Sequence, residues 1–406
     1  MIGLVLEGGG AKGAFQIGAY KALKELGIKI DGVTGTSIGA LNGALIAQGD
    51  EEKAYEIWSQ VNPSKLFQLN EKEYKKLLKL DISISDIAYF FGKMKDIVKN
   101  KGLDVSLIKS LLHELVDETK MRNSKMEYGL VTFSLTNMKP YELFLSEIPP
   151  GKVIEYLMAS ASFPVFKLEK VDGNLFIDGG VFDNMPINLL IRKGYKEIIA
   201  IRTFGIGMYK KITDPSVHIT YINPSEDLGG VLDFDNTRAN KNLQLGYYDT
   251  LQIYKKWQGK FYYIEPKKND DHILRFLMDY PEDRILELGL VFGFKDIQPK
   301  RMMFEFILPR IADLLGFSKE ASYEDIIIGV CEEIAKEVNV ERFHLYSFES
   351  FIQAIAKNNK SYKRSAKRII PGFIKQNEIL SRAVKEEIFH EIISKILSPA
   401  SGEILS

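Results

Sequence analysis

The sequence has little of several features that mark particular classes of protein. It contains one cysteine, Cys331, which excludes a disulfide framework and is typical of a reducing compartment. Lys plus Arg equals Asp plus Glu, 54 each, so no overall charge favours nucleic acid as a partner. The chain has no apolar run of about 18 residues and no basic leader of the secretory kind. These absences predict a cytoplasmic protein that reaches membranes only from outside.

The N-terminal part alternates between short apolar runs and helical patterns. Residues 2–6 and 28–35 are typical of buried strands, and each is followed by a helical stretch, about 14–26 and 37–49. Strands that alternate with helices at this spacing predict a doubly wound, mostly parallel α/β sheet with helices on both faces.

The pattern changes near residue 268, where amphipathic helical segments replace the alternation of strands and helices. We therefore expect an α/β domain over residues 1–267 and a helical C-terminal module over residues 268–406. The sequence assigns no role to this module.

The stretch "GGGAKG" at residues 8–13 satisfies the pattern G-x-G-x-x-G between a strand and a helix. An acid, Asp31, follows at about the distance found in dinucleotide-binding folds, so a nucleotide site formed by Gly8, Gly10, Gly13 and Asp31 is one interpretation. A tight structural turn is a second. A third is a row of peptide N–H groups left bare for a ligand, because glycine lets backbone approach closely.

A second motif, "GTSIG" at residues 35–39, is G-x-S-x-G at another junction of strand and helix. Such a sharp turn exposes the serine, here Ser37, and the flanking Gly35 and Gly39 relieve crowding. The N-terminus of the following helix favours negative charge beside the serine. The alternative is a serine that only caps the helix.

A nucleophilic serine needs donors for the oxyanion that it creates. The peptide N–H groups of Gly8, Gly9 and Gly10 are the expected donors, which favours the third interpretation of the glycine loop. Lys12 adds positive charge or contacts a phosphate headgroup, unless it is simply a solvated side chain on the first helical turn.

The serine also needs a base. Of the five histidines only His218 is a candidate for a catalytic triad, and its context is that of an ordinary strand residue. Asp178 in "IDGG" ends an apolar run and precedes Gly179 and Gly180, as expected for a side chain at the carboxyl edge of a sheet, where ligands bind. A turn-forming aspartate is the alternative.

These motifs in this order, with "ASASFPVF" at 159–166 before the last, resemble patatin-like phospholipases over roughly residues 1–260. The stretch "DGGVFDNMPI" is similar to the family's segment after its catalytic aspartate. The family consists of serine acyl hydrolases with a Ser–Asp dyad on a doubly wound α/β fold. The resemblance implies Ser37 as nucleophile, Asp178 as base, Gly8, Gly9 and Gly10 as the oxyanion loop, and no metal or cofactor.

The expected function is that of a phospholipase A or lysophospholipase, which cleaves carboxylic esters of lipids through an acyl-enzyme. A dinucleotide-binding protein and a catalytically inactive lipid-binding module are the alternatives. Two segments rich in lysine or arginine, 82–101 and 357–368, suit peripheral contact with anionic membranes, although a solvated helix face explains them as well. No nucleic acid partner is expected.

Overall fold

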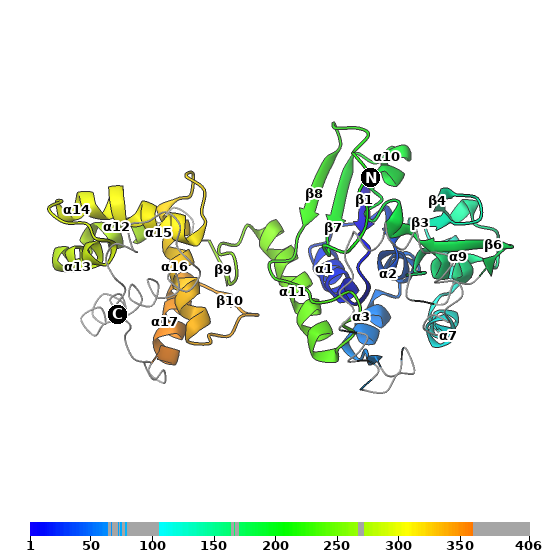
Figure 1. Ribbon diagram of the computed structural model, residues 1–406, viewed down its shortest axis with the longest axis horizontal. Helices are drawn as coiled ribbons and strands as arrows, with labels where there is room; N and C mark the ends of the chain where they lie inside the picture. Colours follow the sequence, from blue (N-terminus) through cyan, green and yellow to red (C-terminus); the bar gives the residue numbers. More distant parts are fainter. Residues whose placement is uncertain are drawn as a thin grey trace. The chain divides into compact units, whose positions relative to one another are not determined.

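The computed structural model describes residues 1–63, 66, 72, 74, 78, 105–163, 166, 170–266 and 272–359. The chain divides into two compact units, Met1–Ile253 and Tyr254–Ser406 (Figure 1). This division comes earlier than the boundary after residue 267 that the sequence suggests. Strand β9 (Tyr263–Ile264) lies between the two positions and pairs with β10 (Leu345–Tyr346) in the second unit.

A mixed sheet forms the centre of the first unit, with strand order β5-β6-β3-β2-β1-β7-β8 and β4 paired to β3. The pairings that join β3, β2, β1, β7 and β8 are parallel, and those that involve β4, β5 and β6 are antiparallel. The strands are β1 (Ile2–Leu6), β2 (Gly32–Thr36), β3 (Glu127–Ser134), β4 (Lys139–Phe144), β5 (Lys170–Val171), β6 (Asn174–Asp178), β7 (Glu197–Ile201) and β8 (His218–Ile222).

Helices cover both faces of this sheet, as the sequence predicts. Successive side chains of a strand point to opposite faces. Val5 of β1 packs in one cluster with Ile187 and Leu190 of α10 (Ile187–Arg192). The next residue, Leu6, instead lies against Gly43 of α2 (Ile38–Ala47). The doubly wound α/β architecture is therefore confirmed.

Glycines allow the helices of the first unit to pack closely. A Cβ on Gly18 of α1 (Gly13–Glu25) would lie 1.9 Å from the carbonyl oxygen of Leu243 in α11 (Asn236–Lys255). A Cβ on Gly39 of α2 would lie 2.2 Å from the carbonyl oxygen of Leu6. The remaining α-helices in the described part of this unit are α3 (Glu51–Ser59), α7 (Ser106–Leu115), α8 (Glu118–Asn123) and α9 (Val153–Ser160).

The second unit is mainly helical and has its own hydrophobic core. Cys331 lies in this core, where burial raises the pKa of its thiol to about 12, so the thiol stays protonated. Its helices within the described residues are α12 (His272–Asp279), α13 (Glu282–Phe292), α14 (Pro299–Met302), the π-helical turn η4 (Met303–Ile307), α15 (Leu308–Leu315), α16 (Tyr323–Glu337) and α17 (Phe348–Asn359). Within the described ranges, none of the chain's helices combines the length and the apolar character needed to cross a bilayer.

Candidate active site

The glycine loop follows β1 at the carboxyl edge of the sheet, where the protein's own backbone and side chains press against it. A Cβ on Gly8 would lie 2.2 Å from Oδ1 of Asn184, and one on Gly9 would lie 2.4 Å from Oγ1 of Thr203. Gly10 has a φ of 57° in addition, so a side chain there would be strained. All three positions therefore require glycine.

The amides of the loop are used differently from one another. The N–H of Gly8 donates to the carbonyl of Asn184 at 2.9 Å. Within the described part of the chain, the amides of Gly9 and Gly10 donate no hydrogen bond, and both residues line the cavity that also contains Ser37 and Asp178. Gly9 and Gly10 are thus the residues whose donors remain available, while Gly8 braces the loop.

Ser37 occupies the sharp turn between β2 and α2, with φ 56° and ψ −126°. Its side chain makes no capping hydrogen bond, which argues against the interpretation as a simple helix cap. The turn needs its glycines, because a Cβ on Gly35 would lie 2.3 Å from the backbone of Gly39. Such a conformation is costly for a serine and is typical of a nucleophile elbow.

Ser160, at the end of α9, supports this turn from below. Its hydroxyl accepts the N–H of Ser37 at 3.0 Å and donates to the carbonyl of Val131 at 2.7 Å. The buried hydroxyl thereby connects the elbow to β3. Sequence reasoning missed this role, since a serine in a helical pattern has no signal of its own.

Asp178 ends β6, where it pairs with Thr132 of β3, and is 5% exposed. Its Oδ1 accepts the N–H of Gly180 at 2.8 Å. Burial raises the pKa of Asp178 to about 6, opposed by smaller lowering effects of hydrogen bonds from Ser37 and Gly180. The base candidate is therefore more basic than an ordinary aspartate.

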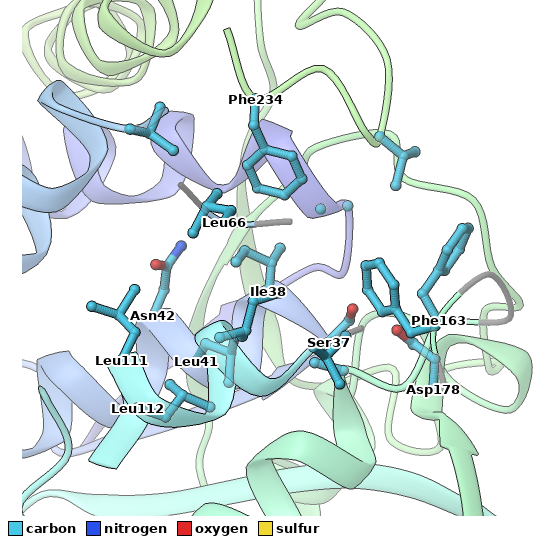
Figure 2. A pocket seen from close by; sticks show the side chains of 18 of the residues that line it. Ser37, Ile38, Leu41, Asn42, Leu66, Leu111, Leu112, Phe163, Asp178 and Phe234 are labelled. Carbon is cyan, nitrogen blue, oxygen red and sulfur yellow. The ribbon is translucent and has the colours of Figure 1, made fainter. Parts of the chain in front are cut away.

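The side chains of Ser37 and Asp178 lie next to each other and to Phe163 at one end of a pocket (Figure 2). The Ser37 hydroxyl is near enough to influence the carboxyl, yet the buried Oδ2 of Asp178 has no partner that meets regular hydrogen-bond geometry. Catalytic hydrogen bonds are often long or poorly aligned before substrate binds. The pair has the proximity expected of a nucleophile and its base.

The remaining motif glycines hold these elements together. A Cβ on Gly13 would lie 2.5 Å from Cγ1 of Ile38, and one on Gly179 would lie 2.1 Å from the carbonyl oxygen of Val131. Asn184 joins the two loops, since its Nδ2 donates to the carbonyl of Gly8 at 3.2 Å. The glycine loop, the serine turn and the Asp–Gly–Gly turn thus form one packed assembly.

A fully buried acid, Glu7, stands immediately before the glycine loop. Its Oε2 accepts the N–H of Thr203 at 2.8 Å and lies 3.5 Å from Nε of Arg202, and its Oε1 accepts the hydroxyl of Tyr209. Burying a carboxylate is costly unless it is paired and hydrogen-bonded, as it is here. Glu7 therefore ties the loop after β7 to the end of β1, a contact that the sequence does not reveal.

An apolar cavity extends from Ser37 and Asp178, past Ile38 and Leu41, towards Leu111 and Leu112 (Figure 2). Among the described residues, the polar ones that line it, apart from glycines, are Ser37, Asn42, Asp178 and Asn184. The others are aliphatic or aromatic: Ile38, Leu41, Leu45, Ala54, Ile57, Trp58, Val61, Leu66, Val105, Ile108, Leu111, Leu112, Leu115, Met158, Ala161, Phe163, Phe166, Ile206, Val231, Leu232 and Phe234. Such a lining suits a hydrocarbon chain.

Asn42 does not make this cavity polar, because its amide is already satisfied by protein. Its Nδ2 donates to Gln16 and to the carbonyl of Gly13, and its Oδ1 accepts Nε1–H of Trp58 at 3.0 Å. The network fixes Trp58 in the cavity wall.

Two residues considered from the sequence lie at the opposite edge of the sheet. Asp31 precedes β2, accepts the N–H of Ile2 at 2.7 Å and lies 3.9 Å from the N-terminal amine. His218 begins β8 and pairs with Glu197 at the start of β7. The dinucleotide interpretation is wrong, because its acid and its glycine loop stand at opposite ends of β1 and β2. His218 begins a strand at the edge opposite Ser37, so it is not placed to form a triad with Ser37.

Lys12 is neither fully solvated nor aimed at the cavity. Its Nζ donates to the carbonyl of Phe204 at 3.1 Å. Burial lowers the pKa of Lys12, while the charges of Asp227 and Glu7 act in the opposite direction. The headgroup role considered for Lys12 stays a prediction.

Other sequence-based candidates lie outside the described residues. These are the lysine-rich segment 82–101 and all but the first three residues of the segment 357–368. Across the ranges that are described, no group of three or more His, Cys, Asp or Glu side chains is placed to hold a metal ion.

Comparison with known proteins gives a family match over the region that contains Ser37 and Asp178. The family model described as patatin-like phospholipase matches residues 4–191. A patatin-like phospholipase domain-containing protein of Caenorhabditis elegans is 27% identical over 335 residues, 79% of this chain and 22% of that protein. Neuropathy target esterase sws of Drosophila melanogaster is 30% identical over 204 residues, 49% of this chain and 13% of that protein.

The chain thus spans less than a quarter of the length of these two curated relatives. Among solved structures, VipD from Legionella pneumophila is 14% identical, with 99% of this chain and 87% of that chain covered and a TM-score of 0.40.

Proposed function

We propose that residues 4–191, which match the family model described as patatin-like phospholipase, form a domain that hydrolyses carboxylic esters of lipids with Ser37 as nucleophile and Asp178 as base. One observation carries the proposal. Ser37, the partnerless Oδ2 of Asp178 and the available amides of Gly9 and Gly10 all border the same apolar cavity.

The first half-reaction makes an acyl-enzyme. The hydroxyl oxygen of Ser37 attacks the ester carbonyl carbon, and its proton passes to the carboxylate of Asp178. The carbonyl oxygen becomes an oxyanion that accepts hydrogen bonds from the amides of Gly9 and Gly10, each worth typically ~10²–10³ in rate. The tetrahedral intermediate then collapses, and the alcohol leaves with the proton that Asp178 returns to it.

Water completes the cycle. Asp178 accepts a proton from water as the water oxygen attacks the acyl carbon, and the same amides hold the second oxyanion. Collapse releases the carboxylic acid and returns the proton from Asp178 to Ser37. The scheme uses water and groups of the protein, and it needs no cofactor.

The environment of Asp178 supports its assignment as the base. An aspartate of ordinary pKa is a weak base at neutral pH. Burial raises the pKa of Asp178 to about 6, which strengthens it as a proton acceptor and still leaves it mainly ionised at pH 7. Because Asp178 lies near enough to Ser37 for the hydroxyl to influence its pKa, the scheme needs no imidazole between them.

The cavity supports a lipid as substrate. Phe163 lies beside the reacting pair, and aliphatic side chains such as Leu41 and Leu112 line the space beyond (Figure 2). We assign this space to the acyl chain of a phospholipid, lysophospholipid or related ester, because burying methylene groups there stabilises the complex by ~0.8 kcal/mol each.

A fluorophosphonate probe tests the assignment of the nucleophile in the full chain. We expect covalent labelling of the wild type, loss of labelling in Ser37→Ala, and normal labelling in Ser146→Ala, which removes an exposed hydroxyl elsewhere. Release of fatty acid from phospholipid, lysophospholipid and monoacylglycerol then identifies the substrate class. A wild type that is neither labelled nor active would favour the inactive lipid-binding module instead.

A further inference from the structure

The segment 202–211, "RTFGIGMYKK", connects β7 to β8 and packs against the candidate active site; we name it the rim loop. A Cβ on Gly205 would lie 1.9 Å from the carbonyl oxygen of Gly8, and one on Gly207 would lie 2.8 Å from that of Gly180. The N–H of Met208 donates to the carbonyl of Gly180 at 2.8 Å. The rim loop is therefore fastened to the oxyanion loop and to the Asp–Gly–Gly turn.

Buried and exposed residues lie next to each other along the rim loop. Thr203, Gly205 and Gly207 are buried against the active-site loops, and Ile206 lines the cavity. Phe204 and Met208, between and beside them, are 50% and 53% exposed, and Tyr209 is 42% exposed. Large apolar side chains are thus presented to solvent on the same loop whose inner residues border the catalytic pair.

The exposure of Phe204 is built into the backbone. The residue has a φ of 48°, a backbone conformation that residues other than glycine rarely adopt. Its N–H lies 3.3 Å from Oε2 of Glu7, its carbonyl accepts Nζ of Lys12, and the guanidinium of Arg202 lies 4.4 Å from its ring. Several contacts therefore hold a strained residue whose ring remains half in water.

The charge of the rim loop has one sign. Its ten residues include Arg202, Lys210 and Lys211 and no carboxylate. Arg202 is paired with Glu7, while both lysines are exposed. The nearest following acid, Asp214, is bound to Lys196 at 2.6 Å. Nζ of Lys210 lies 3.6 Å from the centre of the Phe182 ring, and its charge acts to lower the pKa of Asp183. The exposed face thus combines apolar side chains with positive charge, as on protein surfaces that enter the headgroup region of anionic lipid.

We propose that the rim loop docks on an anionic lipid surface, with Phe204 and Met208 inserted and Lys210 and Lys211 over the headgroups. Docking there sets the active-site cavity beside the lipid from which an ester would be drawn. This inference rests on the proposed function only in the identity of that lipid as substrate. The binding itself requires no catalysis.

Vesicle binding by the full chain carrying Ser37→Ala tests the inference without hydrolysis. We expect co-flotation with vesicles of phosphatidylcholine and phosphatidylglycerol, and weaker co-flotation with phosphatidylcholine alone. The double variant Phe204→Asn, Met208→Gln should bind both kinds of vesicle about tenfold or more weakly, since two half-exposed apolar side chains no longer insert. Asparagine is chosen at position 204 because it tolerates positive φ.

A matched variant, Leu290→Gln, removes an apolar side chain of the second unit that is 58% exposed, and it should bind vesicles as the parent does. Thermal unfolding of each variant checks that it folds. Should the Phe204 and Met208 variant fail to fold, Lys210→Gln with Lys211→Gln replaces it. The two lysine substitutions together should weaken binding to the anionic vesicles by about 30-fold and leave binding to vesicles of phosphatidylcholine alone unchanged.

Two results would overturn the inference: a Ser37→Ala protein that binds neither vesicle, or folded rim-loop variants that bind as well as their parent. Rim-loop variants that keep vesicle binding and lose a protein partner would also overturn it. If the wild type hydrolyses no ester while Ser37→Ala still binds vesicles through the rim loop, the proposed function fails and the docking surface stands.

Discussion

The two edges of the first unit's sheet differ in how completely they satisfy their polar groups. At the edge where the parallel strands begin, Asp31 binds the Ile2 amide, and Glu127 pairs with Lys193 at 3.1 Å. At the edge where they end, Ser37 has a positive φ. There, among the residues that the structure describes, Gly9 donates no hydrogen bond and the buried Oδ2 of Asp178 has no regular partner.

This difference occurs within the same strands, so neither β-propensity nor burial of the sheet explains it. Buried polar groups in proteins are nearly always hydrogen-bonded, and backbone strain persists only where the surroundings enforce it. The paired polar groups of the amino edge are what selection for stability alone would produce. At the carboxyl edge, one carboxylate oxygen of Asp178 and the amides of Gly9 and Gly10 have no regular partner among the described residues, which points to binding and chemistry there.

The largest effect should come from removing the base at the carboxyl edge. We expect Asp178→Asn to lower kcat for a lipid ester by about 10³-fold or more, because the amide accepts no proton from Ser37. Fatty acid release under substrate saturation measures this change. Asp31→Asn makes the same substitution at the amino edge and should change kcat by less than about twofold. A kcat within about tenfold of wild type for Asp178→Asn would mean that another group is the base.

The oxyanion loop should show the next largest effect. Gly9→Ala places a Cβ 2.4 Å from Oγ1 of Thr203, so the loop must shift and its amides lose their aim. We expect a decrease of about 10²-fold in kcat/KM.

Gly230→Ala is the control for this prediction, because its added Cβ would meet no atom nearer than 3.7 Å. If both variants keep full kcat/KM, the amides of the glycine loop do not stabilise the transition state.

The pH dependence of activity should reflect the burial of Asp178. The carboxyl must be ionised to accept a proton, and burial raises its pKa to about 6. We therefore expect kcat/KM to fall tenfold for each pH unit below about 6 and to level off above it. An aspartate of ordinary pKa would place this limb about two units lower. Initial rates on a substrate without ionisable groups in this range distinguish the two cases.

A second buried acid at the carboxyl edge should appear in stability. Asp183 is 1% exposed and its Oδ2 has no hydrogen-bond partner; burial first, and the charge of Glu142 next, raise its pKa to about 7. Because the folded state holds the proton more tightly, Asp183 contributes most stability at low pH. That contribution is lost as the pH rises from about 4 to 7, by up to about 1.4 kcal/mol per pH unit.

Chemical unfolding of wild type and Asp183→Asn across this pH range tests the assignment. The variant should lose less stability with rising pH, since its neutral amide does not titrate and keeps an oxygen for the Met185 amide, 3.2 Å from Oδ1. Parallel stability curves for the two proteins would show that Asp183 has no such role.

The smallest effect should come from His218. It lies at the amino edge in β8 and is exposed. We expect His218→Ala to keep probe labelling and to change kcat/KM by less than about twofold, because a Ser–Asp pair uses no imidazole. Loss of labelling in a folded His218→Ala protein would revive the triad.

Much of the fold was predictable because its signals are local. The apolar run before the glycines, the small residues of α2 and the glycines around Ser37 each act on near neighbours in the chain, and β1, α1 and α2 lie close to where the sequence places them. The inclusion of β9 in the second unit has no such local signal, because β9 pairs with a strand far along the chain.

The residues of the site also fall into those with a local sequence signal and those without one. Ser37, Asp178 and the glycine loop stand out in the sequence, and their catalytic roles stay predictions. The commitment of the Gly8 amide to Asn184, the support of Ser37 by Ser160 and the anchoring of the rim loop by Glu7 have no sequence signal. Each joins residues more than a hundred positions apart, so it depends on strand order and on how loops close over the sheet edge.

The sequence by itself determined the α/β alternation, the serine turn and the positions where only glycine fits, because local sterics and hydrophobic periodicity act over a few residues. Only the tertiary structure decided which amides remain available, how far burial raises the pKa of Asp178, and that Asp31 and His218 lie away from Ser37. These properties depend on what surrounds each group in space, and strand order and packing set those surroundings.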